Sequence, residues 1–383
     1  MKGAKQAIYM DIMLSLKEKI SNSEYQVGQK LTELALANDF NCSRITAKKA
    51  LDELEHEGLI IRKKGSGSYV ADASARPESV ESKNISMILP PGFLASNLME
   101  YFYGASTVLS ARGYILGTAS VDPSDSLTDG DLILRMIQNN CAGIIYYPAH
   151  DNMNTELLTM LSMNDFPLVT IDKQFSGVPT SSVISDNYNG THELTKLLLN
   201  KGHKNIAFVS NENINATSTI KNRFLGYATA LKEHGFGLNL DNIVSEYNQE
   251  LKINHPDIYN QVINLLPLKE EQFDFFTAII NRLRANGVTA IVGATDIVAM
   301  YMIKTCEHLG LSIPGDMALV GFDDHILLQH MGISVTTVRQ DFYAMGYRAA
   351  ELLMKKIDNR TAPCENLVFP VEIVERTSSG AIE

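Results

Sequence analysis

Short apolar runs alternate with amphipathic helical patterns through most of this 383-residue chain, and this alternation limits its fold more than any other feature. The apolar runs lie at residues 85–89, 114–116, 143–147, 168–171, 206–209, 288–292 and 317–322. Helical patterns lie between them, at 98–111, 188–200, 220–233 and 296–309. Strands that alternate with helices form parallel sheets with right-handed crossovers. The number of repeats predicts two α/β lobes, with ligands bound at the carboxyl ends of the strands.

A small head precedes this body. Residues 71–84 read ADASARPESVESKN, a small, polar and charged segment without apolar periodicity. Such a composition is typical of a linker. The sequence therefore predicts a head at 1–70, a linker at 71–84 and a body at 85–383.

The head has the pattern of three helices and a β-hairpin. Apolar residues recur every four positions in the first helix, at Ile8, Ile12, Leu16 and Ile20. Thr32 is a suitable cap for a second helix, and Ser43 for a third that runs from Arg44 to about residue 57. Two β-type runs, 59–61 and 68–70, flank a basic tip that contains glycines. This order predicts a winged helix-turn-helix of the α+β class.

Basic side chains gather where such a domain meets DNA. Arg44 and Lys48 lie one turn apart near the start of the third helix, and Lys63 and Lys64 lie on the wing. A recognition helix inserts its N-terminal end into the major groove, where Arg and Lys reach phosphates and guanine edges. Residues 1–70 hold eleven Lys and Arg against nine Asp and Glu, a net charge of +2, so residues 71–383 carry −13 of the total of −11. The alternative is a small helical domain whose charged face is only solvated.

The head also resembles the GntR family of bacterial regulators. Residues 43–51 read SRITAKKAL, residues 58–60 read GLI, and residues 65–70 read GSGSYV. The family pattern is S-R-x-T-V-R-x-A-L with a later G-L-I and a basic G-x-G-x-x-V wing, so Lys48 stands where arginine is usual. Lysine cannot form the planar fork of arginine, and operator preference is expected to differ. The pattern and the resemblance together predict DNA contacts from Glu33, Ser43, Arg44, Thr46, Lys48, Lys49, Lys63, Lys64, Gly65 and Gly67.

In the body, polar residues follow several predicted strands. Asp172 follows the run at 168–171, Asp323 follows the run at 317–322, and Thr295 follows the run at 288–292. Sugar sites use carboxylates and planar donors because each hydroxyl both donates and accepts a hydrogen bond. Taken singly, each aspartate also fits the role of a helix cap. No nucleophile elbow, phosphate loop or metalloprotease motif is present, so we expect neither an enzyme nor a cofactor.

The body resembles the core of LacI-type regulators, which are related to periplasmic sugar-binding proteins. The matching segments read SDNYNG (185–190), GHKNIAF (202–208), RFLGY (223–227), GLSIPGD (310–316), VGFDD (320–324) and TTVRQ (336–340). The resemblance implies a two-lobed α/β periplasmic-binding-protein-like (type I) domain. It implies ligand contacts from Asp172, Arg223, Asp323 and Thr295, the last of which stands where the family usually has Asn. Phe93 and Tyr147, in loops after the first and third strands, are aromatic candidates, although ordinary packing also explains Tyr147.

A GntR-type head on a LacI-type body is the arrangement of arabinose-repressor-like regulators. It implies a homodimeric repressor of carbohydrate-utilisation genes that binds double-stranded operator DNA and is released by a small sugar, with arabinose the best single choice. The helix near 98–112 would lie at the dimer interface. The alternatives are a regulator whose ligand strengthens DNA binding and a sugar-processing enzyme with a DNA-binding head.

Other features limit where the chain acts. The four cysteines (Cys42, Cys141, Cys306 and Cys364) lie far apart without metal-ligand spacing, which is typical of reduced thiols and predicts no metal. No apolar run approaches the roughly 18 residues of a membrane helix, and acidic residues interrupt the N-terminal apolar pattern. We therefore expect a cytoplasmic protein without a membrane partner. Residues 248–270, which include two prolines, predict a loop or a helical excursion of unassigned role.

Overall fold

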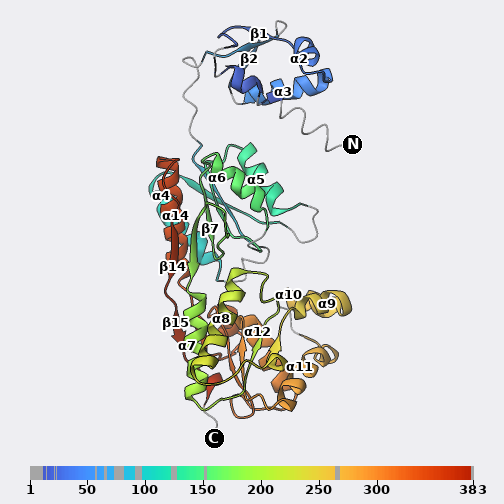
Figure 1. Ribbon diagram of the computed structural model, residues 1–383, viewed down its shortest axis with the longest axis vertical. Helices are drawn as coiled ribbons and strands as arrows, with labels where there is room; N and C mark the ends of the chain where they lie inside the picture. Colours follow the sequence, from blue (N-terminus) through green and yellow to red (C-terminus); the bar gives the residue numbers. More distant parts are fainter. Residues whose placement is uncertain are drawn as a thin grey trace. The chain divides into compact units, whose positions relative to one another are not determined.

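The computed structural model describes residues 12–13, 15–20, 22, 24–56, 58–63, 67–72, 82–90, 97–121, 127–150, 153–263 and 268–380. The chain divides into two compact units, Met1–Ser82 and Lys83–Glu383, which are coloured along the sequence in Figure 1. The predicted linker falls mostly outside the described residues. Its last two residues, Lys83 and Asn84, belong to the body instead, and Asn84 begins a strand.

The first unit contains the predicted helices and hairpin. Residues 12–13 and 15–20 are helical, and helices α2 (Glu33–Asp39) and α3 (Arg44–His56) follow. Strands β2 (Ile60–Lys63) and β3 (Gly67–Val70) form the antiparallel hairpin. A short strand β1 (Lys30–Leu31), which the sequence pattern did not indicate, pairs with the other edge of β3. The sheet order is therefore β1-β3-β2.

Local signals place these elements as the sequence predicts. The Thr32 hydroxyl accepts a hydrogen bond from the Ala35 amide at 3.2 Å, and the Ser43 hydroxyl accepts one from the Thr46 amide at 3.1 Å. These caps satisfy amides that have no partner within a first helical turn. The apolar stripe of α3 is buried in the core of the unit and consists of Ala47, Ala50, Leu51 and Leu54. The opposite, polar side of α3 remains exposed.

The second unit has two lobes. Lobe 1 holds a six-stranded parallel sheet in the order β14-β8-β7-β6-β4-β5. Its strands are β4 (Asn84–Ile88), β5 (Ile115–Ala119), β6 (Gly143–Tyr146), β7 (Leu168–Ile171), β8 (Ser181–Ser185) and β14 (Asn366–Phe369). Helices α4 (Met99–Ala111) and α14 (Phe342–Asp358) cover one face, and α5 (Asp129–Gln138) and α6 (Thr155–Met163) cover the other. Neighbouring residues such as Ile144 and Ile145 point into opposite cores, as pleated strands require.

Lobe 2 holds a four-stranded parallel sheet in the order β10-β9-β11-β12. Its strands are β9 (Ile206–Val209), β10 (Ile243–Val244), β11 (Ala290–Gly293) and β12 (Ala318–Val320). Helices α7 (Asn187–Asn200) and α8 (Ser218–Glu233) pack on one face. The other face is covered by α9 (Tyr247–Asn254), α10 (Pro256–Ile263), α11 (Asp274–Ala285) and α12 (Asp296–His308). The described part of residues 248–270 is therefore largely helical, with Pro256 at the first position of α10, where its missing N–H costs nothing.

The chain passes between the lobes after β8, after β13 (Thr337–Arg339) and after β14, which leads to β15 (Glu372–Val374). These passages bring segments that are far apart in sequence side by side between the lobes (Figure 1). Within the described residues, no helix combines the length and apolar character that a membrane span requires.

Candidate ligand cleft and DNA-binding surface

A cavity of about 240 Å³ lies between the two lobes of the body. It lies just below the roughly 300–1,000 Å³ of typical ligand pockets, so it suits a small molecule. Most of the lining residues have polar side chains, and most follow strands, as expected for α/β lobes. The structure brings together five of the six predicted ligand residues, namely Tyr147, Asp172, Arg223, Thr295 and Asp323. The sixth, Phe93, lies outside the described residues.

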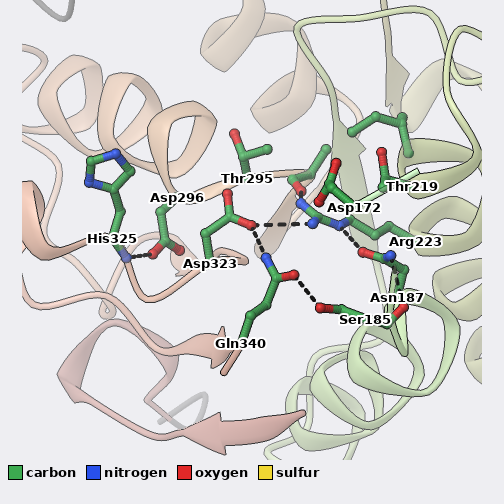
Figure 2. A network of polar contacts seen from close by, with 12 residues as sticks. Asp172, Ser185, Asn187, Thr219, Arg223, Thr295, Asp296, Asp323, His325 and Gln340 are labelled. Atoms are coloured by element: carbon green, nitrogen blue, oxygen red, sulfur yellow. Dashed lines mark hydrogen bonds and ion pairs between the residues drawn. The ribbon is translucent and has the colours of Figure 1, made fainter. Parts of the chain in front are cut away.

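Arg223, on α8, is the centre of the lobe 2 side of the cleft (Figure 2). Its guanidinium is almost fully buried and donates to Asn187 Oδ1 at 2.8 Å and to the Ala294 carbonyl at 2.7 Å. A third hydrogen bond reaches Asp323 Oδ1 at 3.2 Å, and the ring of Phe322 lies 3.7 Å from the guanidinium carbon. These contacts fix the orientation of a charged donor at the wall of the cavity.

Asp323 links this arginine to the passages between the lobes. Gln340, which follows β13, donates from Nε2 to Asp323 Oδ1 at 2.7 Å, and its carbonyl oxygen accepts from the Ser185 hydroxyl at the end of β8 (Figure 2). Burial raises the pKa of Asp323 to about 6, although Arg223 opposes the rise, and the charge of Asp172 adds to it. Asp323 is therefore mainly ionised at neutral pH and accepts hydrogen bonds.

The lobe 1 side of the cavity carries a second ion pair. Asp172, after β7, lies 2.7 Å from the ammonium of Lys173, and both side chains are more than nine-tenths buried. The same ammonium lies 4.2 Å from the ring centre of Tyr147. Burial raises the pKa of Tyr147, and the charge of Asp172 together with a hydrogen bond to it raises the pKa further. Tyr147 is therefore a donor to Asp172 as well as a packing residue.

Thr295 has two roles in the structure. It caps α12, because its hydroxyl accepts from the Val298 amide at 3.3 Å, and it also lines the cavity. Asp172 and Asp323 have positive φ values of 71° and 121° and are not caps of the helices that the structure describes. The helix-cap alternative thus applies to Thr295 and not to these two aspartates.

Sequence reasoning missed several residues of the cleft. Lys173 gave no signal, because neighbours in an extended strand point to opposite sides. Gln340 and Asn187 lie within the segments that resemble LacI-type proteins. Only the three-dimensional structure shows that Gln340 forms a hydrogen bond with Asp323 and that Asn187 forms one with Arg223. Asn97 spans the cleft from the start of α4 and donates to the carbonyls of Asp323 and Asp324 at 3.3 and 3.0 Å. No motif indicated it.

The predicted DNA-binding residues lie on two adjoining parts of the head. A groove of about 480 Å³ brings together Glu33, Arg44, Lys63 and Gly67, and Lys30 on β1 also lines it. Ser43, Thr46, Lys48 and Lys49 lie outside this groove, on α3 or directly before it; Thr46 is half-buried and the other three are exposed. Lys64 and Gly65 lie outside the described residues.

Not every basic residue of the head is available for DNA. Arg62, on β2, pairs with Asp52 and with Glu55, whose carboxylate lies 3.2 Å away, so it fastens the wing to α3. Lys30 and Lys63 instead lie over the ring of Tyr69, at 6.0 and 5.1 Å from its centre. The two lysines therefore place one cation on each of the two strands that flank β3, Lys30 on β1 and Lys63 on β2. Lys30 is the basic residue of this surface that sequence reasoning missed.

Sequence profiles of known families match both units. The profile of bacterial regulatory proteins of the gntR family matches residues 8–70. The profile of periplasmic binding proteins and the sugar-binding domain of the LacI family matches residues 125–255, and that of the periplasmic-binding-protein-like domain matches residues 195–379.

Similar proteins cover almost the full length of the chain. The arabinose metabolism transcriptional repressor of Geobacillus stearothermophilus is 27% identical over 98% of both chains. The repressor of the same name from Halalkalibacterium halodurans is 26% identical over 92% of this chain and 91% of its own. Among the solved structures, a complex of the regulator CelR with cellobiose has a TM-score of 0.62 at 19% identity and covers 94% of each chain. A LacI family regulator from Enterococcus faecium with bound ribose has a TM-score of 0.61 at 19% identity, over 78% of this chain and all of its own. These structures share the fold.

Proposed function

The chain joins a GntR-type DNA-binding domain to a LacI-type periplasmic-binding-protein-like domain, and from this premise we propose that it is a cytoplasmic, sugar-responsive repressor of transcription. The head binds double-stranded operator DNA, and a small sugar in the cleft of the body weakens that binding. The similar proteins are regulators of transcription rather than enzymes.

The arrangement of the cleft is the observation that carries this proposal. Each lobe contributes one carboxylate beside one cation, Asp172 with Lys173 and Asp323 with Arg223. A sugar hydroxyl donates to a carboxylate while a neighbouring hydroxyl accepts from the cation, so each pair matches a polyhydroxylated molecule. A ligand bound to both pairs connects the lobes and favours their closed arrangement, because its contacts are complete only there.

Arabinose is the first candidate for the ligand. The support comes from the two arabinose metabolism repressors, whose similarity extends over nearly the whole chain, head and body together. The cavity volume fits a monosaccharide better than a longer oligosaccharide. The repressed genes, on the same grounds, are those of carbohydrate utilisation.

A homodimer is part of the proposal because palindromic operators require two heads. The helix at 98–112, predicted to lie at the dimer interface, is α4 with its flanking residues. Beside α14 it leaves large side chains exposed, namely Tyr103 at 57% and Tyr343 at 43% of their surface. Two such rings on neighbouring helices offer apolar area for a symmetric contact.

A mobility-shift assay tests the proposed function. The protein selects its operator from a random-sequence DNA library, and the shift of that DNA is then measured with L-arabinose, D-ribose, D-xylose and D-galactose. We expect one of these free sugars to release the DNA. A sugar that tightens the complex would assign a corepressor role instead. DNA that is not bound, or binding that no sugar alters, would contradict the proposal.

A further inference from the structure

Lys173 occupies an unusual position for a lysine. Its side chain is only 7% exposed, and it lies on the wall of the interlobe cavity rather than at the surface. Lysine is seldom buried unless its ammonium has partners. The position therefore requires an explanation beyond the packing of its aliphatic stem.

Backbone geometry turns Lys173 into the cleft. Strand β7 ends at Ile171, and the next residue, Asp172, has a φ of 71°. In an extended strand Asp172 and Lys173 would point to opposite sides of the sheet. The left-handed conformation of Asp172 interrupts this alternation, so both side chains line the same cavity.

The ammonium has more donors than its neighbours use. Three hydrogens are available, and Asp172 Oδ2 accepts one of them at 2.7 Å. The ring of Tyr147 faces the ammonium at 4.2 Å and provides a cation–π contact. Among the described residues, the structure records no further acceptor for Lys173. At least one donor therefore remains for a molecule in the cavity, and a buried donor without a partner is costly.

The charges around the cavity indicate what that molecule carries. Lys173 and Arg223 supply two positive charges, and Asp172, Asp323 and Glu212 supply three negative ones. His325 adds none at neutral pH, because burial lowers its pKa and its Nδ1 accepts from the Leu327 amide at 3.2 Å. The lining is thus slightly negative, and a phosphate or carboxylate on the ligand is repelled where screening by water is weak.

We propose that Lys173 is a specificity-determining residue of the cleft that donates a hydrogen bond to a hydroxyl or ring oxygen of an uncharged sugar. It acts in concert with Asp172, which accepts from the neighbouring hydroxyl, so the pair recognises two adjacent oxygens. The charge balance of the lining excludes sugar phosphates and sugar acids. This inference rests on the proposed function and adds to it both a ligand contact and the charge class of the ligand.

Titration calorimetry on the full chain tests the inference. The probes are L-arabinose, D-ribose, D-xylose and D-galactose, together with arabinose 5-phosphate and L-arabinonate as anionic counterparts. We expect a neutral sugar to bind and its anionic counterparts to bind at least a hundredfold more weakly. Lys173→Met, which keeps the length of the stem, should lower the affinity for the neutral sugar roughly tenfold or more. The exposed Lys232→Met is the matched control and should bind like the wild type.

A second readout separates a ligand contact from mere neutralisation of Asp172. Monodeoxy analogues of the bound sugar are titrated into the wild type and into Lys173→Met. The analogue that lacks the oxygen bound by Lys173 should bind both proteins equally well, whereas the others retain the difference. An equal loss with every analogue would mean that Lys173 only balances charge, and would overturn the inference. If Lys173→Met folds poorly, a second pair of proteins gives the same comparison without an unpaired buried charge. The double variant Asp172→Asn/Lys173→Met is then compared with the single variant Asp172→Asn.

The remaining outcomes distinguish the inference from the proposed function. A neutral sugar that binds wild type and Lys173→Met alike overturns the role of Lys173 but leaves a sugar-responsive regulator. Preference for the phosphate or the acid overturns the uncharged class alone. If none of the neutral sugars binds, the proposed function and the inference fall together.

Discussion

Three carboxylates gather where β11 and β12 end, and each is held differently: Asp296 and Asp324 are buried, whereas Asp323 is half-buried. Asp323 faces the cleft and accepts from Arg223 and Gln340. Asp324 turns away and is bound by Arg339 and Arg376, at 2.7 and 2.6 Å. Burial alone would raise the pKa of Asp324, but hydrogen bonds from the two arginines outweigh it and lower the pKa.

Among the residues that the structure describes, no cation pairs with Asp296, and its pKa changes in the opposite direction. It is 1% exposed and accepts from the His325 amide at 2.7 Å and from the Thr337 hydroxyl at 2.6 Å. Burial raises its pKa from 3.8 to about 7, and the charge of Asp323 adds to the rise. Between these values the folded protein holds a proton that the unfolded chain releases. The contribution of Asp296 to the free energy of unfolding therefore falls as pH rises from about 4 to about 7.

Asp296→Asn should reduce this dependence on pH. Asparagine is uncharged, and its amide can donate to Thr337 while its oxygen accepts from His325. Chemical denaturation at several pH values between 5 and 8 should show a shallower fall in stability than in the wild type. Asp241→Asn, at an exposed position, should keep the wild-type slope. The same steep fall in both variants would refute the assignment to Asp296.

Lys48→Ala should weaken operator binding without affecting the fold. Lys48 is exposed one turn into α3, where a recognition helix meets base edges, so its loss should cost roughly 1–3 kcal/mol of binding free energy. Fluorescence anisotropy with a labelled operator measures the change. Lys232→Ala, in the body, serves as the control. Unaltered affinity of Lys48→Ala would argue against this docking of the head.

Arg223 and Asp323 could be predicted from sequence because they lie in segments with a recognisable pattern. Lys173 could not, since its direction depends on one φ angle at Asp172. Asn97 was equally hidden, because its hydrogen bonds join residues more than 220 positions apart. Local patterns carry no information on contacts of that range.

At the scale of elements, the body depends on close helix pairs. Helices α4 and α14 pack side by side on one face of the lobe 1 sheet (Figure 1). A methyl group on Gly104 would lie 2.0 Å from the Tyr343 carbonyl oxygen, and one on Gly346 would lie 2.1 Å from the Tyr101 carbonyl oxygen. Each helix thus approaches the backbone of the other at a glycine. A methyl group on Gly226 of α8 would similarly lie 2.3 Å from the Tyr188 carbonyl oxygen of α7.

Gly104→Ala should push α4 and α14 apart and destabilise lobe 1. Overpacking usually costs about 1–3 kcal/mol, and a clash with backbone leaves little room for relief. Guanidinium denaturation followed by tyrosine fluorescence measures the loss, since the chain has no tryptophan. Gly117→Ala, on β5, is the control, because no atom lies within 4 Å of the added methyl group. Equal stability of the two variants would show that the helix pair tolerates separation.

One of the strands that sequence reasoning missed, β8, has a clear physical cause. Strand β8 reads SSVIS and lacks an apolar run, yet it lies inside the sheet. Its serines have partners, such as Asn366 Oδ1, which accepts from the Ser182 hydroxyl at 2.8 Å. Buried hydroxyls with partners cost little, so hydropathy does not reveal the strand. The apolar strands β4, β6, β7 and β9 were predicted close to their observed bounds.

At the scale of the whole molecule, the proposed regulation depends on coupling between the cleft and the DNA. Asn97 joins α4 of lobe 1 to the loop after β12 of lobe 2, and Gln340 joins that loop to the passage after β8. A ligand that binds both ion pairs acts on the same residues. The ligand can shift the equilibrium between the open and closed arrangements of the lobes only by as much as its binding free energies for these two arrangements differ.

Because such coupling is reciprocal, the most direct measurement is the affinity for the sugar with and without operator DNA. Calorimetry on the free protein and on its operator complex gives both values, and anisotropy gives the loss of DNA affinity in saturating sugar. We expect operator DNA to weaken sugar binding by the same factor by which sugar weakens operator binding. Arg223→Ala should keep operator affinity and show no effect of sugar, and the exposed Arg282→Ala should behave as the wild type. Sugar that binds equally well with and without operator would contradict the central claim.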